Sequence, residues 1–150
     1  MDYELFADQV RSLLASERDF IANAANFAAA LYEALPEVNW AGFYFARGEE
    51  LVLGPFCGKP ACTRLPIGAG VCGQSFSGAQ TLVVDDVGKF DGHIVCDSAS
   101  RSEISVPLVA DGKPYGVFDI DSPQFARFSA SDRAGIERLV AAFLEYTKAT

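Results

Sequence analysis

The chain has 150 residues, half of them apolar, and a formal net charge of -8 at pH 7. This length fits a single domain over residues 1–150 that buries roughly 70% of the surface its unfolded chain exposes. The negative charge repels phosphate backbones and anionic lipids, which argues against nucleic acid and membranes as partners. The acidic, amphipathic start differs from a signal peptide and predicts a cytoplasmic protein.

Two helices are predicted in the N-terminal part of the chain, where apolar residues recur at steps of three and four. The first covers Tyr3 to Leu14, and the second runs from Phe20 to Leu35. Pro36 forbids continuation of the second helix. Ser16 with Asp19 resembles a capping box at its start.

From Trp40 the apolar period changes to two, which indicates strands. The segments NWAGFYFA and ELVLGPFC, with a turn at 47–49, predict a β-hairpin. Residues 58–97 are rich in glycine and small side chains, and predict a short strand at 82–84 but mostly loops. Long loop-rich regions are uncommon in compact domains and are usually functional.

The last third of the chain predicts a second hairpin and a helix. The segments EISVPLVA and YGVFDIDS flank Asp111-Gly112-Lys113-Pro114, a strong turn signal. A stripe of apolar residues at 136–144 predicts the helix, with Ser129 and Asp132 as its capping box. Helices around an antiparallel meander, without alternating βαβ units, indicate an α+β fold with helices packed on one sheet face.

Carboxylates gather on one face of the segment YGVFDIDS. Strand alternation places Tyr115, Val117, Asp119 and Asp121 on one face, and Phe118 and Ile120 on the other. A three-residue hairpin loop puts Glu103 opposite Asp121, whereas a two-residue loop turns Glu103 to the other face. Adjacent carboxylates repel, so this arrangement needs a cation or a proton.

Four cysteines are present, Cys57, Cys62, Cys72 and Cys96. In a reducing compartment they are free thiols, metal ligands or redox catalysts rather than permanent disulfides. Cys62, Cys72 and Cys96 lie in segments expected to be loops, which glycines allow to converge over one pocket. The intervals hold no C-x-x-C, so the sequence predicts no metal site. Cys57 ends an apolar strand, which favours a structural role.

These segments resemble the free methionine-(R)-sulfoxide reductases, a GAF-domain family with three cysteines in this order and spacing. The likeness extends over nearly the whole chain and includes NWAGFYF, GVCG, GKFDGHIVCD, SRSEISVPL and GVFDIDS. It implies a single GAF domain over residues 1–150. In such a domain, N- and C-terminal helices pack on one face of an antiparallel sheet, and loops cover a ligand pocket on the other.

The resemblance also implies roles for individual residues. It makes Cys96 the nucleophile and Cys62 the resolving cysteine, with Cys72 in a supporting or alternative resolving role. The acidic pocket corresponds to Glu103, Asp119 and Asp121, with Glu103 favoured as substrate ligand and possible acid. Trp40 and Tyr44 correspond to an aromatic wall around the methyl-sulfinyl end of the substrate, although core packing explains them nearly as well.

The chemistry of two thiols fits this activity. A thiolate attacks the sulfoxide sulfur and becomes a sulfenic acid, which a second thiol converts to a disulfide. An external dithiol such as thioredoxin reduces that disulfide, so no bound cofactor is needed and NADPH enters only indirectly. Carboxylates that bind an ammonium select the free amino acid, methionine sulfoxide, over a peptide-bound residue. The preference for the (R) epimer follows from the resemblance alone.

Two alternatives stay open at this point. Many GAF domains bind a small ligand or sense redox state without chemistry, so a non-catalytic binding or redox-sensing domain is the rival hypothesis. His93, three residues before Cys96, either activates that thiol or is a loop residue with no catalytic role. Related GAF proteins also predict a homodimer formed through the helices.

Overall fold

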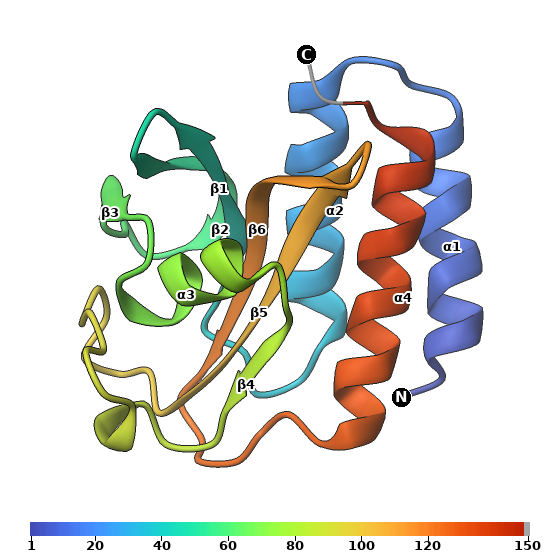
Figure 1. The fold of residues 1–150 in the computed structure, drawn as a ribbon. Coiled ribbons are helices and arrows are strands. Elements are labelled where there is room, and N and C mark those ends of the chain that lie inside the picture. Colours follow the sequence, from blue (N-terminus) through green and yellow to red (C-terminus); the bar gives the residue numbers. More distant parts are fainter. Residues whose placement is uncertain (149–150) are drawn as a thin grey trace.

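The computed structural model describes residues 1–148 and contains a six-stranded antiparallel sheet of order β3-β2-β1-β6-β5-β4 (Figure 1). Its strands are β1 (Trp40–Arg47), β2 (Glu50–Gly58), β3 (Arg64–Pro66), β4 (Leu82–Val84), β5 (Ser102–Ala110) and β6 (Lys113–Ser122). Pairing of β1 with β6 at the centre places Trp40 directly opposite Asp121. Two segments about eighty residues apart therefore meet in the middle of the sheet.

Three helices cover one face of the sheet: α1 (Tyr3–Ala15), α2 (Phe20–Ala34) and α4 (Ala130–Tyr146). Helix α2 packs on β1 and β2 and α4 packs on β5, while α1 lies further out against α4 (Figure 1). This confirms the expected α+β architecture. Within residues 1–148 no helix is both long and apolar enough to cross a bilayer. The homodimer stays a prediction.

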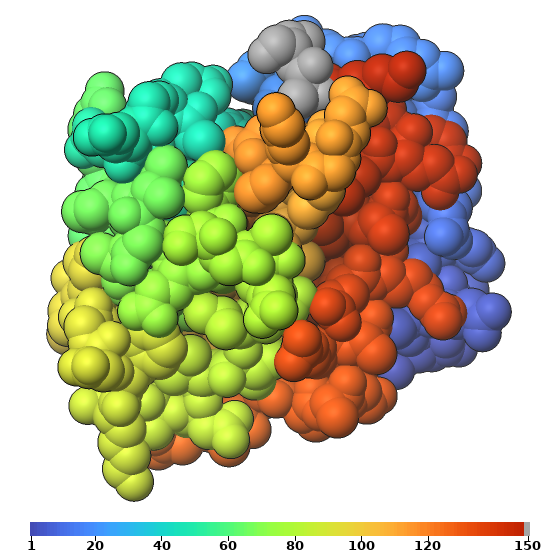
Figure 2. All heavy atoms as spheres, in the orientation of Figure 1, coloured from blue at the N-terminus to red at the C-terminus, as the bar shows by residue number. Residues whose placement is uncertain are grey.

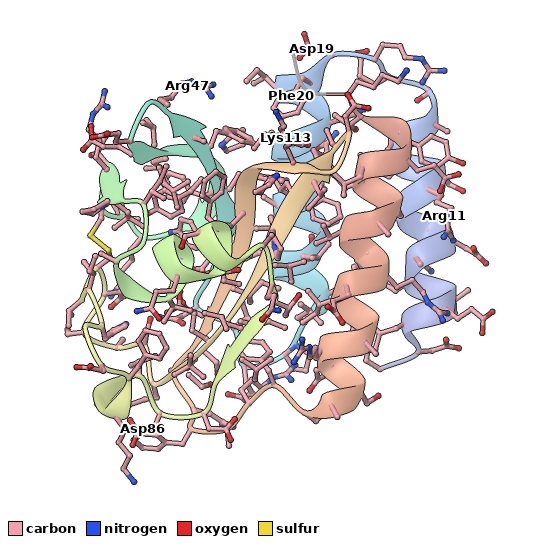
Figure 3. The ribbon with its side chains drawn as sticks, in the orientation of Figure 1. Arg11, Asp19, Phe20, Arg47, Asp86 and Lys113 are labelled. Carbon is pink, nitrogen blue, oxygen red and sulfur yellow. A yellow bond between two sulfur atoms is a disulfide. The ribbon has the colours of Figure 1, made fainter. Side chains whose placement is uncertain are left out.

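The helix starts agree with the sequence in one case and differ in another. Ser129 and Asp132 form the predicted capping box of α4. The predicted box of Ser16 and Asp19 is wrong, because Ser16 caps the C-terminus of α1. Asp19 is itself the N-cap of α2, where Figure 3 labels it, and accepts a hydrogen bond of 2.8 Å from the backbone N–H three residues later.

An aromatic cluster joins the helices to the sheet. Phe27 of α2, Phe43 of β1, Phe118 of β6 and Phe143 of α4 are fully buried, with neighbouring ring centroids 4.7–5.9 Å apart. Burial of each such side chain contributes roughly 1.5–3 kcal/mol to stability. Because this cluster commits one face of the sheet to the helices, the opposite face is available for a pocket.

The middle of the chain is more regular than the sequence predicts. The strand at 82–84 is confirmed as β4, but residues predicted as loop also form β3 and the helix α3 (Gly70–Gly78). Helix α3 contains glycines and has little intrinsic helix propensity, so its formation depends on tertiary packing. The hydroxyl of Ser75 lies 2.7 Å from the carbonyl of Gln80 and 3.1 Å from that of Ser105, which ties α3 to β5.

The second hairpin departs from simple alternation. Its loop has two residues, Asp111 and Gly112, both with positive φ. A β-bulge follows, because Leu108 pairs with Gly116 and the next pair skips Tyr115. The predicted position of Tyr115 on the acidic face is therefore wrong. Tyr115 packs against the helix-side core, where its ring stacks on that of Phe45 at 6.4 Å.

Candidate active site

Three carboxylates share the sheet face that lies away from the helices. In the β5–β6 pair Glu103 lies opposite Asp121, and Ser105 lies opposite Asp119. Glu103, Asp119 and Asp121 line one cavity. Of the two hairpin registers that the sequence left open, the structure therefore has the one that joins Glu103 to the aspartates.

Burial changes the protonation of this group. Asp119 is only 3% exposed, and its Oδ1 and the Oδ1 of Asp121 are buried without a hydrogen-bond partner among residues 1–148. Burial raises the pKa of both aspartates well above the usual range, and the neighbouring carboxylates raise it further. The adjacent acids require either a cation or a proton, and the raised pKa values favour a proton on the aspartates.

Cys72 lies in helix α3, next to Glu103, rather than in the predicted loop. Its buried thiol donates to Oε2 of Glu103 at 3.7 Å. Burial raises the pKa of the Cys72 thiol well above its usual value, and Asp119 and Glu103 raise it further. Cys72 is therefore held as a neutral thiol, which makes it a poor nucleophile.

Cys62 and Cys96 are joined by a disulfide, seen as the yellow bond in Figure 3. Their Cα atoms are 5.4 Å apart although 34 residues separate them in sequence. Cys62 lies in the loop after β2 and Cys96 in the loop before β5, so the two loops do converge as predicted. Cys57, half-buried, and Cys72 are the free cysteines.

An aromatic wall from β1 forms another side of the pocket. The rings of Trp40 and Tyr44 stack at 5.9 Å, and each side chain is 3% exposed. Trp40 Nε1 donates to the carbonyl of Lys59 at 3.2 Å, and the Tyr44 hydroxyl donates to that of Cys62 at 2.7 Å. Tyr44 thus both lines the pocket and holds the loop that carries Cys62.

Three residues that the sequence did not single out, Asn39, Asp97 and Ser100, interact beside Cys96. The side-chain amide of Asn39 is 3.3 Å from Oδ2 of Asp97 and 3.2 Å from the Ser100 hydroxyl. Asp97 directly follows Cys96, and this adjacency is the one feature of the sequence that could have identified it.

His93 is, from the sequence, either an activator of Cys96 or a loop residue. Its Nε2 lies 3.8 Å from Oε1 of Glu103. The His93 side chain therefore lies beside the carboxylates of the pocket.

These elements enclose one pocket. Its lining includes Trp40, Tyr44, Cys72, His93, Cys96, Asp97, Ser100, Glu103, Asp119 and Asp121. Cys62 packs against the aromatic wall beside this lining. The green and yellow segments of the chain cover this side of the molecule in Figure 2. Buried acids and an aromatic wall can position and protonate a small substrate, and the cysteine pair, once its disulfide is reduced to two thiols, can supply two electrons to it.

This fold and pocket are those of a GAF domain, and a GAF domain family model matches residues 16–143. The chain is 50% identical over 141 residues to the free methionine-R-sulfoxide reductase of Escherichia coli, covering 92% of this chain and 86% of that protein. It is 53% identical over 133 residues to Protein YtsP of Bacillus subtilis, covering 87% and 82%.

A solved structure agrees with these relatives. The X-ray structure of the Neisseria meningitidis free methionine-R-sulfoxide reductase in complex with its substrate has a TM-score of 0.92 and 44% identity, and the match covers 96% of this chain and 87% of that one. The chain belongs to the free methionine-R-sulfoxide reductase family of GAF domains.

Proposed function

We propose that this protein reduces free L-methionine-(R)-sulfoxide to L-methionine, with Cys96 as nucleophile and Cys62 as resolving cysteine. The observation that carries the proposal is the Cys62–Cys96 disulfide beside a pocket of buried acids. The relatives named free methionine-R-sulfoxide reductase support the substrate and its stereochemistry.

The reaction proceeds in three steps. The Cys96 thiolate attacks the sulfoxide sulfur, the sulfur–oxygen bond breaks as the oxygen is protonated, and methionine leaves with Cys96 oxidised to a sulfenic acid. The Cys62 thiol then attacks this sulfenic acid, which releases water and forms the disulfide. An external dithiol, for which we propose thioredoxin, finally reduces the disulfide by exchange. No bound cofactor takes part in these steps.

The buried aspartates are suited to supply the proton. Departure of the sulfoxide oxygen requires an acid that is still protonated at neutral pH, and burial keeps Asp119 and Asp121 in that state. Glu103 is proposed as a substrate ligand, because a carboxylate that binds an ammonium discriminates against the neutral amide of a peptide. Trp40 and Tyr44 provide the apolar surface for the methyl-sulfinyl end.

Cys72 is proposed as a supporting residue. Its thiol is buried against Glu103, and its raised pKa argues against a role as first nucleophile. Cys62 is the residue bonded to Cys96 in this structure, which favours Cys62 as the resolving cysteine and leaves Cys72 as the alternative. A cytoplasmic location and a homodimer belong to the same proposal.

A thioredoxin-coupled assay that follows NADPH consumption tests the proposal. We expect turnover with free L-methionine-(R)-sulfoxide and none with the (S) epimer or a peptide-bound sulfoxide. Equal rates with the peptide-bound substrate would contradict the assigned specificity. No NADPH consumption with any of the three would instead favour a ligand-binding or redox-sensing GAF domain.

A further inference from the structure

A thiol, two carboxylates and an imidazole are concentrated at the base of the pocket. The sulfur of Cys72 and one oxygen each of Glu103 and Asp119 lie within 4.8 Å of one another, and all three residues are buried. The Nε2 of His93 is 3.8 Å from the other oxygen of Glu103. Sulfur, carboxylate oxygen and imidazole nitrogen are the donors that Zn²⁺ takes in proteins.

The spacing of these donors approaches that of a tetrahedral ion. Bond lengths of about 2.3 Å to sulfur and 2.0 Å to oxygen place two ligands of tetrahedral zinc about 3.5 Å apart. The Cys72 sulfur and Oε2 of Glu103 are 3.7 Å apart. The oxygen of Asp119 lies within 4.8 Å of both of these atoms.

Unpartnered polar atoms point to a missing ligand at the same place. The Oδ1 atoms of Asp119 and Asp121 and the hydroxyl of Ser105 are buried and make no hydrogen bond within residues 1–148. Ser105 is fully buried and lies directly opposite Asp119. Buried polar atoms without a partner are unfavourable, and a bound cation with its water shell satisfies several at once.

We propose that this pocket binds a single Zn²⁺ ion through Cys72, Glu103 and Asp119, with His93 or water as the fourth ligand. The ion displaces the protons that the Cys72 thiol and the Asp119 carboxyl hold in its absence, and these are released to solvent. The ion is exchangeable and occupies the space of the substrate, so that zinc and methionine sulfoxide exclude one another. This last point rests on the proposed function, whereas the binding of zinc does not. Such a site differs from a structural zinc site, because only one of its ligands is a cysteine.

Cobalt(II) titration of the disulfide form tests the site, because Co²⁺ replaces Zn²⁺ and a cobalt–thiolate bond absorbs in the near ultraviolet. In this form only Cys57 and Cys72 are free. We expect one equivalent of Co²⁺ to give the charge-transfer band, and Zn²⁺ to abolish it by displacement. The band should persist in Cys57→Ser and disappear in Cys72→Ser, with circular dichroism to establish that both variants are folded.

A second variant keeps the test independent of Cys72. Asp119→Asn should weaken Co²⁺ binding at least tenfold while retaining the fold. The inference is overturned if the wild-type protein gives no band, if the band survives in Cys72→Ser, or if Asp119→Asn binds as tightly as wild type. Free methionine sulfoxide should also displace Co²⁺. A cobalt band that depends on Cys72, in a protein without reductase turnover, would leave the metal site standing and reject the proposed function.

Discussion

Glu103 lies directly opposite Asp121 although the loop that joins their strands has only two residues. Without the bulge at Tyr115, the pairing of Ala110 with Lys113 would continue along the hairpin and put Glu103 opposite Ile120, facing the helices. The extra residue shifts the register by one and returns Glu103 to the acidic face. A local irregularity therefore determines whether the pocket has its third carboxylate.

The hairpin loop that precedes this bulge is expected to be sensitive to substitution. Gly112 has a φ of +76°, a conformation that costs an alanine about 1 kcal/mol or more. Gly112→Ala should lower the free energy of unfolding by that amount, measured by urea denaturation. Gly78→Ala, in helix α3 with open space around it, is the control and should be neutral or stabilising. Equal losses in both variants would contradict this explanation.

Cys96 is expected to be indispensable for turnover. Cys96→Ser should reduce NADPH consumption in the coupled assay below detection, because a hydroxyl is a far weaker nucleophile than a thiolate at neutral pH. Cys57→Ser removes a free cysteine outside the pocket and should keep the wild-type rate. Normal turnover in Cys96→Ser would remove the basis for the proposed mechanism.

Loss of Cys62 should separate the chemical step from recycling. With thioredoxin as reductant, Cys62→Ser should release about one methionine per chain and then stop. The sulfenic acid on Cys96 then lacks the resolving thiol with which it forms the disulfide. Mass spectrometry of the arrested protein should find an oxidised Cys96. If slow turnover continues, Cys72 is the resolving residue, and adding Cys72→Ser should stop it. Continued turnover in the double variant would refute resolution by either cysteine.

Asn39 is expected to position the loop that carries Cys96. Asn39→Ala removes two hydrogen bonds to Asp97 and Ser100, and small displacements of a reacting group lower rates by up to about a hundredfold. We predict a tenfold or greater loss of kcat with a smaller change in KM. Gln124→Ala, which removes an exposed amide hydrogen bond to Glu37, should leave kcat unchanged. Equal kcat values in wild type and Asn39→Ala would exclude this role.

Asp119 is expected to make stability decrease as pH rises. Its folded-state pKa is raised, so the folded protein keeps a proton that the unfolded chain loses above about pH 4. The free energy of unfolding therefore falls from about pH 4 up to the raised pKa, by at most about 1.4 kcal/mol per pH unit for this group.

The variant Asp119→Asn tests this linkage, because it cannot ionise. It should be more stable than wild type at pH 7, and the difference should vanish near pH 4. Urea denaturation at several pH values measures both proteins. Asp91→Asn, at an exposed position, should track the wild-type curve. A difference for Asp119→Asn that stays constant from pH 4 to pH 7 would show that burial does not hold the proton.

The sequence by itself determined the N- and C-terminal helices, the central strands and the faces of most of their residues. Apolar periodicity carries this information because it is set by local geometry, and it placed Asp119 and Asp121 on one face of their strand and Phe118 and Ile120 on the other. The resemblance to a known family added the pairing of Cys62 with Cys96, which the structure contains.

Only the tertiary structure decided the features that give the pocket its chemistry. The bulge at Tyr115 fixes the register, and packing against β5 stabilises helix α3 around Cys72 despite its weak helix propensity. The raised pKa values of Asp119 and Asp121 depend on burial beneath segments distant in sequence. Register, burial and electrostatics arise from contacts between remote parts of the chain, and no local pattern encodes them.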